Sequence, residues 1–100
     1  MFVHIVLWKL QEHADGRGKT DNARLIRERF EELANMVDGL QRLDIGTDVF
    51  HTDASADVSL YAEFESRAAY DAYVDLPAHK VLRVFTLAVS VERHIIDYEI

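Results

Sequence analysis

Two histidines and a tyrosine are the side chains of this chain best suited to catalysis. His79 follows Pro77 by two residues, in the first turn of a predicted helix. There the helix dipole and the free N–H groups disfavour a protonated ring. A neutral imidazole near pH 7 can act as a general base. Alternatively, His79 hydrogen-bonds the backbone and fixes the turn at Pro77.

His4 lies in the middle of an apolar segment that reads as a strand. If its side chain faces the helices, His4 and His79 reach one cavity and form an acid–base pair able to remove a proton next to a carbonyl. The alternatives are a core histidine whose nitrogens are satisfied, or one that contacts a partner subunit. Tyr73 precedes His79 by about one and a half helical turns, and it either lines the same space or fills the core.

Other kinds of site have little support in the sequence. Cysteine is absent, which excludes thiolate catalysis and Cys-ligated zinc, and the histidines are dispersed. The spacing of Gly16-Arg17-Gly18-Lys19 does not fit a phosphate-binding loop. The pairs Glu63/Glu65 and Asp97/Glu99 could bind a hard cation, but solvated strand edges explain them more simply. We therefore expect no metal and no cofactor.

The elements that must position these residues follow from hydrophobic periodicity. Strands are predicted at residues 2–10, 40–50, 57–65 and 90–100, and helices at 20–37, 66–75 and 78–88. The order β-α-β-β-α-β predicts an α+β, ferredoxin-like unit with an antiparallel sheet and its helices on one face. A length of 100 residues suits a single domain over residues 1–100.

Apolar stripes at helical spacing identify the faces that the helices bury. The first helix has Ile26, Phe30, Leu33 and Val37, and the last has Val81, Leu82, Phe85 and Ala88. Ser66 is placed to cap the helix that follows it, and Asp38-Gly39 to end the first helix.

The first strand is apolar on both faces, which predicts a partner. Phe2, His4, Val6 and Trp8 alternate with Val3, Ile5 and Leu7. A sheet with one covered face should alternate apolar and polar residues. The helices predicted in these 100 residues can cover only one face of the sheet. The other face therefore needs a second copy of the chain, related by a two-fold axis.

Charge and hydropathy narrow the remaining classes of partner. The net charge is −7 and the pI is about 5.1, which disfavours nucleic acid and an anionic membrane surface. No apolar run approaches the ~20 residues of a membrane helix, and no basic segment of a signal peptide follows Met1. We expect a soluble, cytoplasmic protein.

Several segments together resemble the stress-responsive A/B barrel domain family of the dimeric α+β barrel superfamily. They are HIVLWK at residues 4–9, AEFES at 62–66, YDAYVDLPAH at 70–79 and IDYE at 96–99. The resemblance covers nearly the whole chain and implies a homodimer whose two sheets form a barrel.

A plant branch of that family cyclises a linear polyketide, using a first-strand histidine, the histidine of a Pro-x-His turn and a nearby tyrosine. His4, His79 and Tyr73 match those positions. A further histidine and tyrosine of the cyclase are replaced here by Val58 and Phe30, so half of its polar pocket differs.

The sequence thus favours an uncharacterised dimeric barrel that binds a small apolar or aromatic ligand between sheet and helices. Trp8, Phe30, Val58 and Tyr70 are the residues expected to line the pocket.

The alternative is a small, cofactor-independent lyase, cyclase or monooxygenase acting on a polyketide-like substrate. In that enzyme His79 is the base, His4 the acid or orienting partner, and Tyr73 a donor to the developing enolate. A third reading is a structural dimerisation domain without a pocket. Whether the protein is an enzyme stays open.

Overall fold

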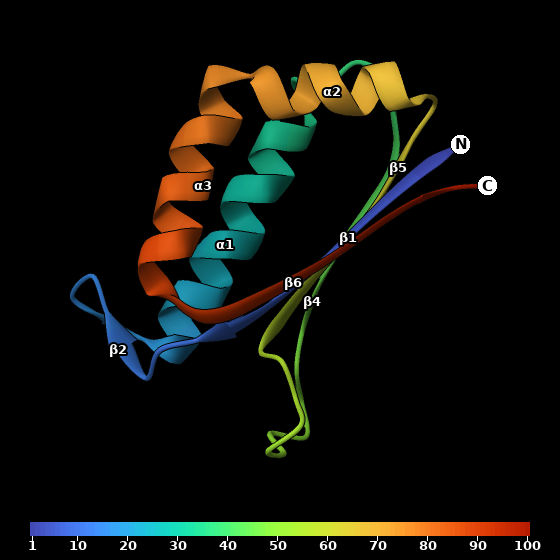
Figure 1. The fold of residues 1–100 in the computed structure, drawn as a ribbon. Helices are drawn as coiled ribbons and strands as arrows, with labels where there is room; N and C mark the ends of the chain where they lie inside the picture. The colour runs from blue at the N-terminus through green and yellow to red at the C-terminus, as the bar shows by residue number, and fades with distance from the viewer.

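An antiparallel sheet of four strands carries three helices on one of its faces (Figure 1). The computed structural model describes residues 1–100. Its strands are β1 (Phe2–Leu10), β4 (Leu40–Thr47), β5 (Val58–Phe64) and β6 (Ser90–Glu99), paired in the order β4-β5-β1-β6. Its helices are α1 (Lys19–Ala34), α2 (Arg67–Asp75) and α3 (Pro77–Val89). This confirms the α+β, ferredoxin-like fold with an antiparallel sheet.

A small hairpin lies between β1 and α1, where neither a strand nor a helix was predicted. Strands β2 (His13–Ala14) and β3 (Arg17–Gly18) pair across Asp15-Gly16, whose φ angles are 55° and 76°. Two consecutive positive φ angles are the mark of a type I′ turn, and Asp-Gly is a preferred sequence for it. The buried Asn22 of α1 ties the hairpin down, because its amide donates to the carbonyl of Ala14 and accepts from Arg17.

Three element ends differ from the sequence prediction. Helix α1 begins at Lys19 after Gly18, with no side-chain cap, and ends at Ala34 rather than at Val37. Strand β4 ends at Thr47, so Val49 lies beyond it and is 77% exposed. The predicted cap of α2 is confirmed, since the backbone N–H of Ala69 donates to the hydroxyl of Ser66 at 3.1 Å.

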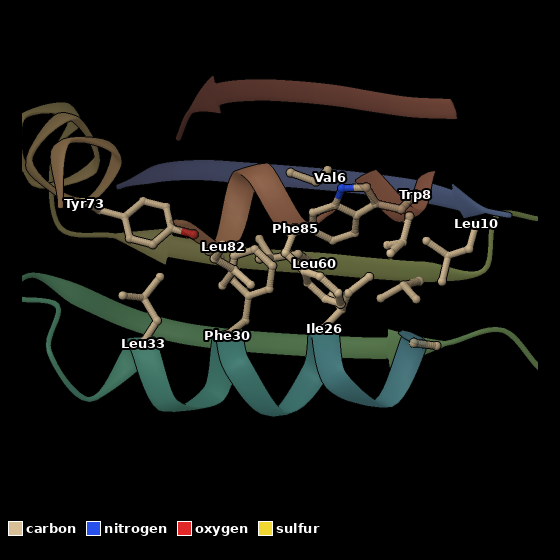
Figure 2. Packing of buried hydrophobic residues seen from close by; sticks show 14 of the residues in the cluster. Val6, Trp8, Leu10, Ile26, Phe30, Leu33, Leu60, Tyr73, Leu82 and Phe85 are labelled. Carbon is tan, nitrogen blue, oxygen red and sulfur yellow. The ribbon is translucent and has the colours of Figure 1, made fainter. Parts of the chain in front are cut away.

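The core lies between the sheet and the helices (Figure 2). Helix α1 contributes the predicted residues Ile26, Phe30 and Leu33, all buried. The inward side chains of the two central strands are Phe2, Val6, Trp8 and Leu10 of β1 and Val58, Leu60, Ala62 and Phe64 of β5. Their alternation places His4, which lies between Phe2 and Val6, on the helix-covered face as well.

Helix α3 is rotated relative to the predicted stripe. Leu82 and Phe85 are buried as expected, but Val81 is 72% exposed and Ala88 is also exposed. Thr86 and Val89 are buried in their place. The helix face that packs against the sheet therefore carries polar residues, His79 and Thr86, as well as apolar ones. The position of the apolar residues alone does not predict this face.

No helix covers the second face of the sheet. Val3, Ile5 and Leu7 of β1 point to it, and the register of β1 with β6 adds Ile96 and Tyr98. Val3 is buried by its neighbours on this face. Leu7 is 40% and Ile96 is 58% exposed. Both faces of β1 are therefore apolar, and one of them is open.

Candidate functional site

A cavity of about 110 Å³ lies between the sheet and helices α2 and α3. It holds most of the residues that the sequence singled out for function. Its polar or aromatic lining residues are His4, Trp8, Phe30, Tyr70, Tyr73, His79, Arg83, Thr86 and Arg93. The remainder are Val6, Leu60, Val74 and Ile95. The cavity opens on one side, between α3 and the edge strand β6. The exposed Arg83 of α3 and Ile95 of β6 lie at this opening.

Strand β1 brings His4 into the cavity wall, where its side chain is buried. The antiparallel register of β1 and β6 sets His4 directly opposite Asp97. Nδ1 of His4 donates a hydrogen bond to Oδ1 of Asp97. This bond fixes the rotation of the imidazole and leaves Nε2 without a side-chain partner. A carboxylate that holds a histidine in this way sets the tautomer and the orientation of its ring.

The break between α2 and α3 positions His79. Leu76 caps both helices in an extended conformation, as expected of a residue before proline, and Pro77 occupies the first turn of α3. The His79 ring then packs edge-on against Tyr73, with the ring centroids 4.5 Å apart. Its Nδ1 is buried and has no side-chain hydrogen-bond partner, and the backbone of Val74 lies within hydrogen-bonding reach of the ring.

His79 is held in its neutral form by its surroundings. Burial lowers the pKa of His79, and the charges of His4 and Arg83 lower it further, while the backbone of Val74 acts in the opposite direction. A neutral imidazole at pH 7 retains a lone pair that can accept a proton.

Two tyrosines of α2 add hydroxyl groups beside the histidines. Burial raises the pKa of Tyr73, so its hydroxyl stays protonated and can donate a hydrogen bond. The pKa of Tyr70 is raised by burial and by the carboxylates of Asp97 and Asp71. The Tyr70 ring also contacts His4, at a centroid distance of 4.9 Å. Figure 2 shows Tyr73 directed from its helix across the core toward Leu82.

Of the expected pocket residues, Trp8, Phe30 and Tyr70 line the cavity and Val58 does not. Trp8 and Phe30 pack with their rings 5.6 Å apart, and the indole Nε1 of Trp8 is buried without a partner. Val58 is the neighbour of Trp8 on β5 and is fully packed in the core. The cavity lies mainly over β1 and β6, so Val58 falls outside it.

Asp97, Arg83 and Arg93 line or support this site but were missed by the sequence analysis. Asp97 and Arg93 share with Ile95 the inward face of β6, at the two-residue spacing of a strand. Arg83 follows His79 by one helical turn on α3. These spacings are visible in the sequence. What the sequence does not contain is the register that puts Asp97 against His4.

Neither of the acidic pairs considered as cation sites gains a third ligand in the structure. No group of three or more His, Asp or Glu side chains comes together at metal-binding distance. Asp97 is engaged by His4, and Glu63 accepts a hydrogen bond from the Tyr61 hydroxyl.

No helix is long and apolar enough to span a membrane.

The arrangement supplies the parts of an acid–base site. It has one neutral histidine, a second histidine oriented by a carboxylate, two protonated tyrosines and an indole N–H. Together they can accept a proton from a carbon acid and hydrogen-bond the oxygen on which negative charge develops.

Comparison with known proteins identifies the fold in other solved structures. A dimeric ferredoxin-like protein of unknown function from Thermobifida fusca superposes with a TM-score of 0.83 at 17% identity, covering 99% of this chain and 90% of that one. A Dabb family protein from Mesorhizobium loti gives 0.76 at 19% identity, covering 99% and 95%. The hydroxynitrile lyase from Passiflora edulis gives 0.81 at 14% identity, covering 99% and 92%.

These likenesses establish the fold alone, because the identities are low. No curated protein matches the sequence. The family profile of the stress responsive A/B barrel domain (Dabb) matches residues 2–100, which is almost the entire chain. The chain therefore belongs to the stress responsive A/B barrel domain family.

Proposed function

We propose that this protein is a cofactor-independent acid–base catalyst that removes a proton next to a carbonyl group of a small cyclic or polyketide-like substrate. The observation that carries the proposal is that His4 and His79, from opposite layers of the fold, line one cavity. A histidine that only satisfied the core or only fixed a turn has no need of a shared cavity. The structural contacts of the two residues, His4 with Asp97 and His79 with the backbone of Val74, are compatible with such a role.

In the proposed reaction His79 acts as the base. Its neutral ring accepts the proton from the carbon next to the carbonyl. The hydroxyl of Tyr73 or the Nε1–H of Trp8 donates a hydrogen bond to the enolate oxygen. His4, held by Asp97, returns a proton to the substrate or to its leaving group. Such a step serves a lyase or a cyclase equally, and a lyase is among the proteins that share this fold.

The cavity limits the size of the substrate. An engineered cavity of about 150 Å³ in another protein binds benzene, and the cavity here has a comparable volume of about 110 Å³ with an open side. We infer that one ring or a short folded chain enters it, while larger groups extend through the opening.

We also propose that the working form is a homodimer in which the open sheet faces of two copies pack together. The accessible apolar residues Ile5, Leu7, Ile96 and Tyr98 give that face the character of an interface. The Thermobifida fusca protein of the same fold is described as dimeric. The cavity lies on the helix side, so dimerisation leaves it free.

The proposal is tested by hydrogen–deuterium exchange at carbon. Phenylacetone carries one ring and an activated methylene group, and NMR in D₂O follows the loss of its methylene protons. We expect the wild-type protein to accelerate exchange and His79→Gln to lower the rate by at least about a hundredfold. Asp97→Asn should cause a smaller loss, because it misorients His4 without removing the base. His13→Gln, at an exposed histidine of the β2–β3 hairpin, should leave the rate unchanged.

A second candidate function is ligand binding without turnover. It is favoured by the apolar part of the lining, since 8 of the 13 lining residues are hydrophobic. Phenylacetone would then quench the fluorescence of Trp8, the only tryptophan of the chain, while its protons failed to exchange. Exchange that survives His79→Gln would remove the proposed base.

A further inference from the structure

Two arginines face the cavity opening from different elements. Arg83 comes from α3 and Arg93 from the edge strand β6, and both line the cavity. The arginines that form ion pairs in this protein are Arg17, Arg24, Arg27 and Arg42. Arg83 and Arg93 form none, so their guanidinium groups are free to bind a ligand.

The two guanidinium groups act on the same part of the cavity. Both lower the pKa of the Tyr70 hydroxyl, against the carboxylates of Asp97 and Asp71, which raise it. Asp97 is already bonded to His4, and Asp71 lies on the exposed face of α2. The rim near Tyr70 therefore carries two unpaired positive charges on a protein whose net charge is −7.

One unpartnered donor lies deeper in the same cavity. The Nε1–H of Trp8 is buried without a hydrogen-bond partner. A buried polar group that lacks a partner is costly unless a ligand or water supplies one. A suitable ligand thus presents an oxygen at its inner end, an apolar body against Trp8 and Phe30, and a negative group at its outer end.

We propose that the ligand of this cavity is a small aromatic or cyclic carboxylate, with its carboxylate between Arg83 and Arg93 and its ring against Trp8. This inference rests on the proposed function and specifies the substrate class of that site. The planar guanidinium group is suited to carboxylates, because its parallel N–H groups match the two oxygens. Arg83 and Arg93 are then specificity-determining residues, while His79 and His4 keep their roles.

The test compares two probes of nearly equal shape that differ in charge. Benzoate is an anion at pH 7 and benzamide is neutral, and Trp8 reports the binding of either through its fluorescence. We expect benzoate to bind the wild-type protein about tenfold more tightly than benzamide, as for a partly exposed charge-assisted contact. Arg83→Gln and Arg93→Gln should each reduce the preference, and the double variant should bind benzoate and benzamide with equal affinity.

Arg67→Gln serves as the matched control. It removes the same charge from an exposed position at the start of α2, outside the cavity. Its preference for benzoate should equal that of the wild type, and circular dichroism should confirm that all variants remain folded.

The outcomes separate this inference from the proposed function. Equal affinity for benzoate and benzamide in the wild type would overturn the carboxylate inference and leave the cavity a binding site for neutral ligands. A preference that survives the double arginine variant would also overturn it. Binding of neither probe would overturn the proposed function itself, since the cavity would then accept no ring-sized ligand.

Discussion

The two histidines of the cavity have different surroundings. His4 is hydrogen-bonded to the carboxylate of Asp97, which fixes the orientation of its ring. His79 has no carboxylate partner, and burial and neighbouring positive charge lower its pKa and favour its neutral form. A neutral base beside an oriented second histidine is an arrangement that suits proton transfer.

This difference predicts a pH dependence of stability that depends on His79. The pKa of His79 is lowered from 6.5 in the folded protein. At pH values between the folded and the unfolded pKa of this residue, the unfolded chain therefore binds more protons than the folded one. The free energy of unfolding therefore falls as the pH falls below 6.5, and it is insensitive to this group above that pH. Urea unfolding from pH 7.5 to pH 5 should show a shallower decline for His79→Gln than for the wild type.

His13→Gln provides the comparison for this experiment, since His13 is exposed. Its stability should follow the wild-type curve at every pH. If the curves of the wild type and His79→Gln ran parallel, the environment described for His79 would be incorrect.

The turns between elements decide how the site is assembled. Leu76-Pro77 ends α2 and starts α3 within one residue, which brings Tyr73 and His79 into contact. The turn from α1 to β4 packs against α2 from the other side. Gly39 in that turn has a φ of +81°, and its carbonyl accepts a hydrogen bond from the N–H of Glu65.

Replacement of Gly39 is predicted to destabilise the fold more than replacement of another glycine of similar φ. A Cβ atom on Gly39 would lie 2.7 Å from the Cβ of Ala69 in α2, whereas one on Gly16, with a φ of +76°, would meet nothing within 4 Å. Gly16→Ala should cost about 1 kcal/mol from backbone strain alone. Gly39→Ala should cost about 1–3 kcal/mol more, because overpacking adds to that strain. Urea unfolding measures both, and equal losses would contradict the close packing of this turn.

At the scale of the whole molecule, the main feature is the open sheet face, whose apolar side chains a single chain leaves exposed to solvent. Leu7, Ile96 and Tyr98 are 40%, 58% and 42% exposed on a continuous face of β1 and β6. Burial of apolar surface is worth roughly 25 cal/mol per Å². A second copy packed on this face would therefore be strongly favoured.

Charges placed on that face should abolish dimerisation. We expect the wild type to sediment as a dimer at micromolar concentration and Leu7→Lys/Ile96→Lys to sediment as a folded monomer, because lysines would be desolvated at the interface. Val84→Lys is the control, since Val84 is 70% exposed on α3, on the helix side of the sheet. A monomeric wild type, or a double variant that stays dimeric, would exclude this face as the interface.

Local patterns in the sequence determined most of the elements. The apolar run of β1, the two-residue alternation of β5 and the helical spacing of apolar residues in α1 depend on neighbours along the chain, and the structure has these elements. The errors lie at element ends and in the rotation of α3, where packing against other elements outweighs local preference. The β2–β3 hairpin also has a local signal, because Asp15-Gly16 is a preferred sequence for its turn.

For the site too, local sequence predicted some features and tertiary packing determined the others. The sequence by itself pointed to His4, His79 and Tyr73, because their residue types and their places on a strand and at a proline turn suit acid–base chemistry. Only the tertiary structure decided that they share a cavity with Arg83 and Arg93, and that Asp97 holds His4 from 93 positions away. The register between the first and last strands sets that pairing, and it arises from the packing of the whole sheet rather than from any segment alone.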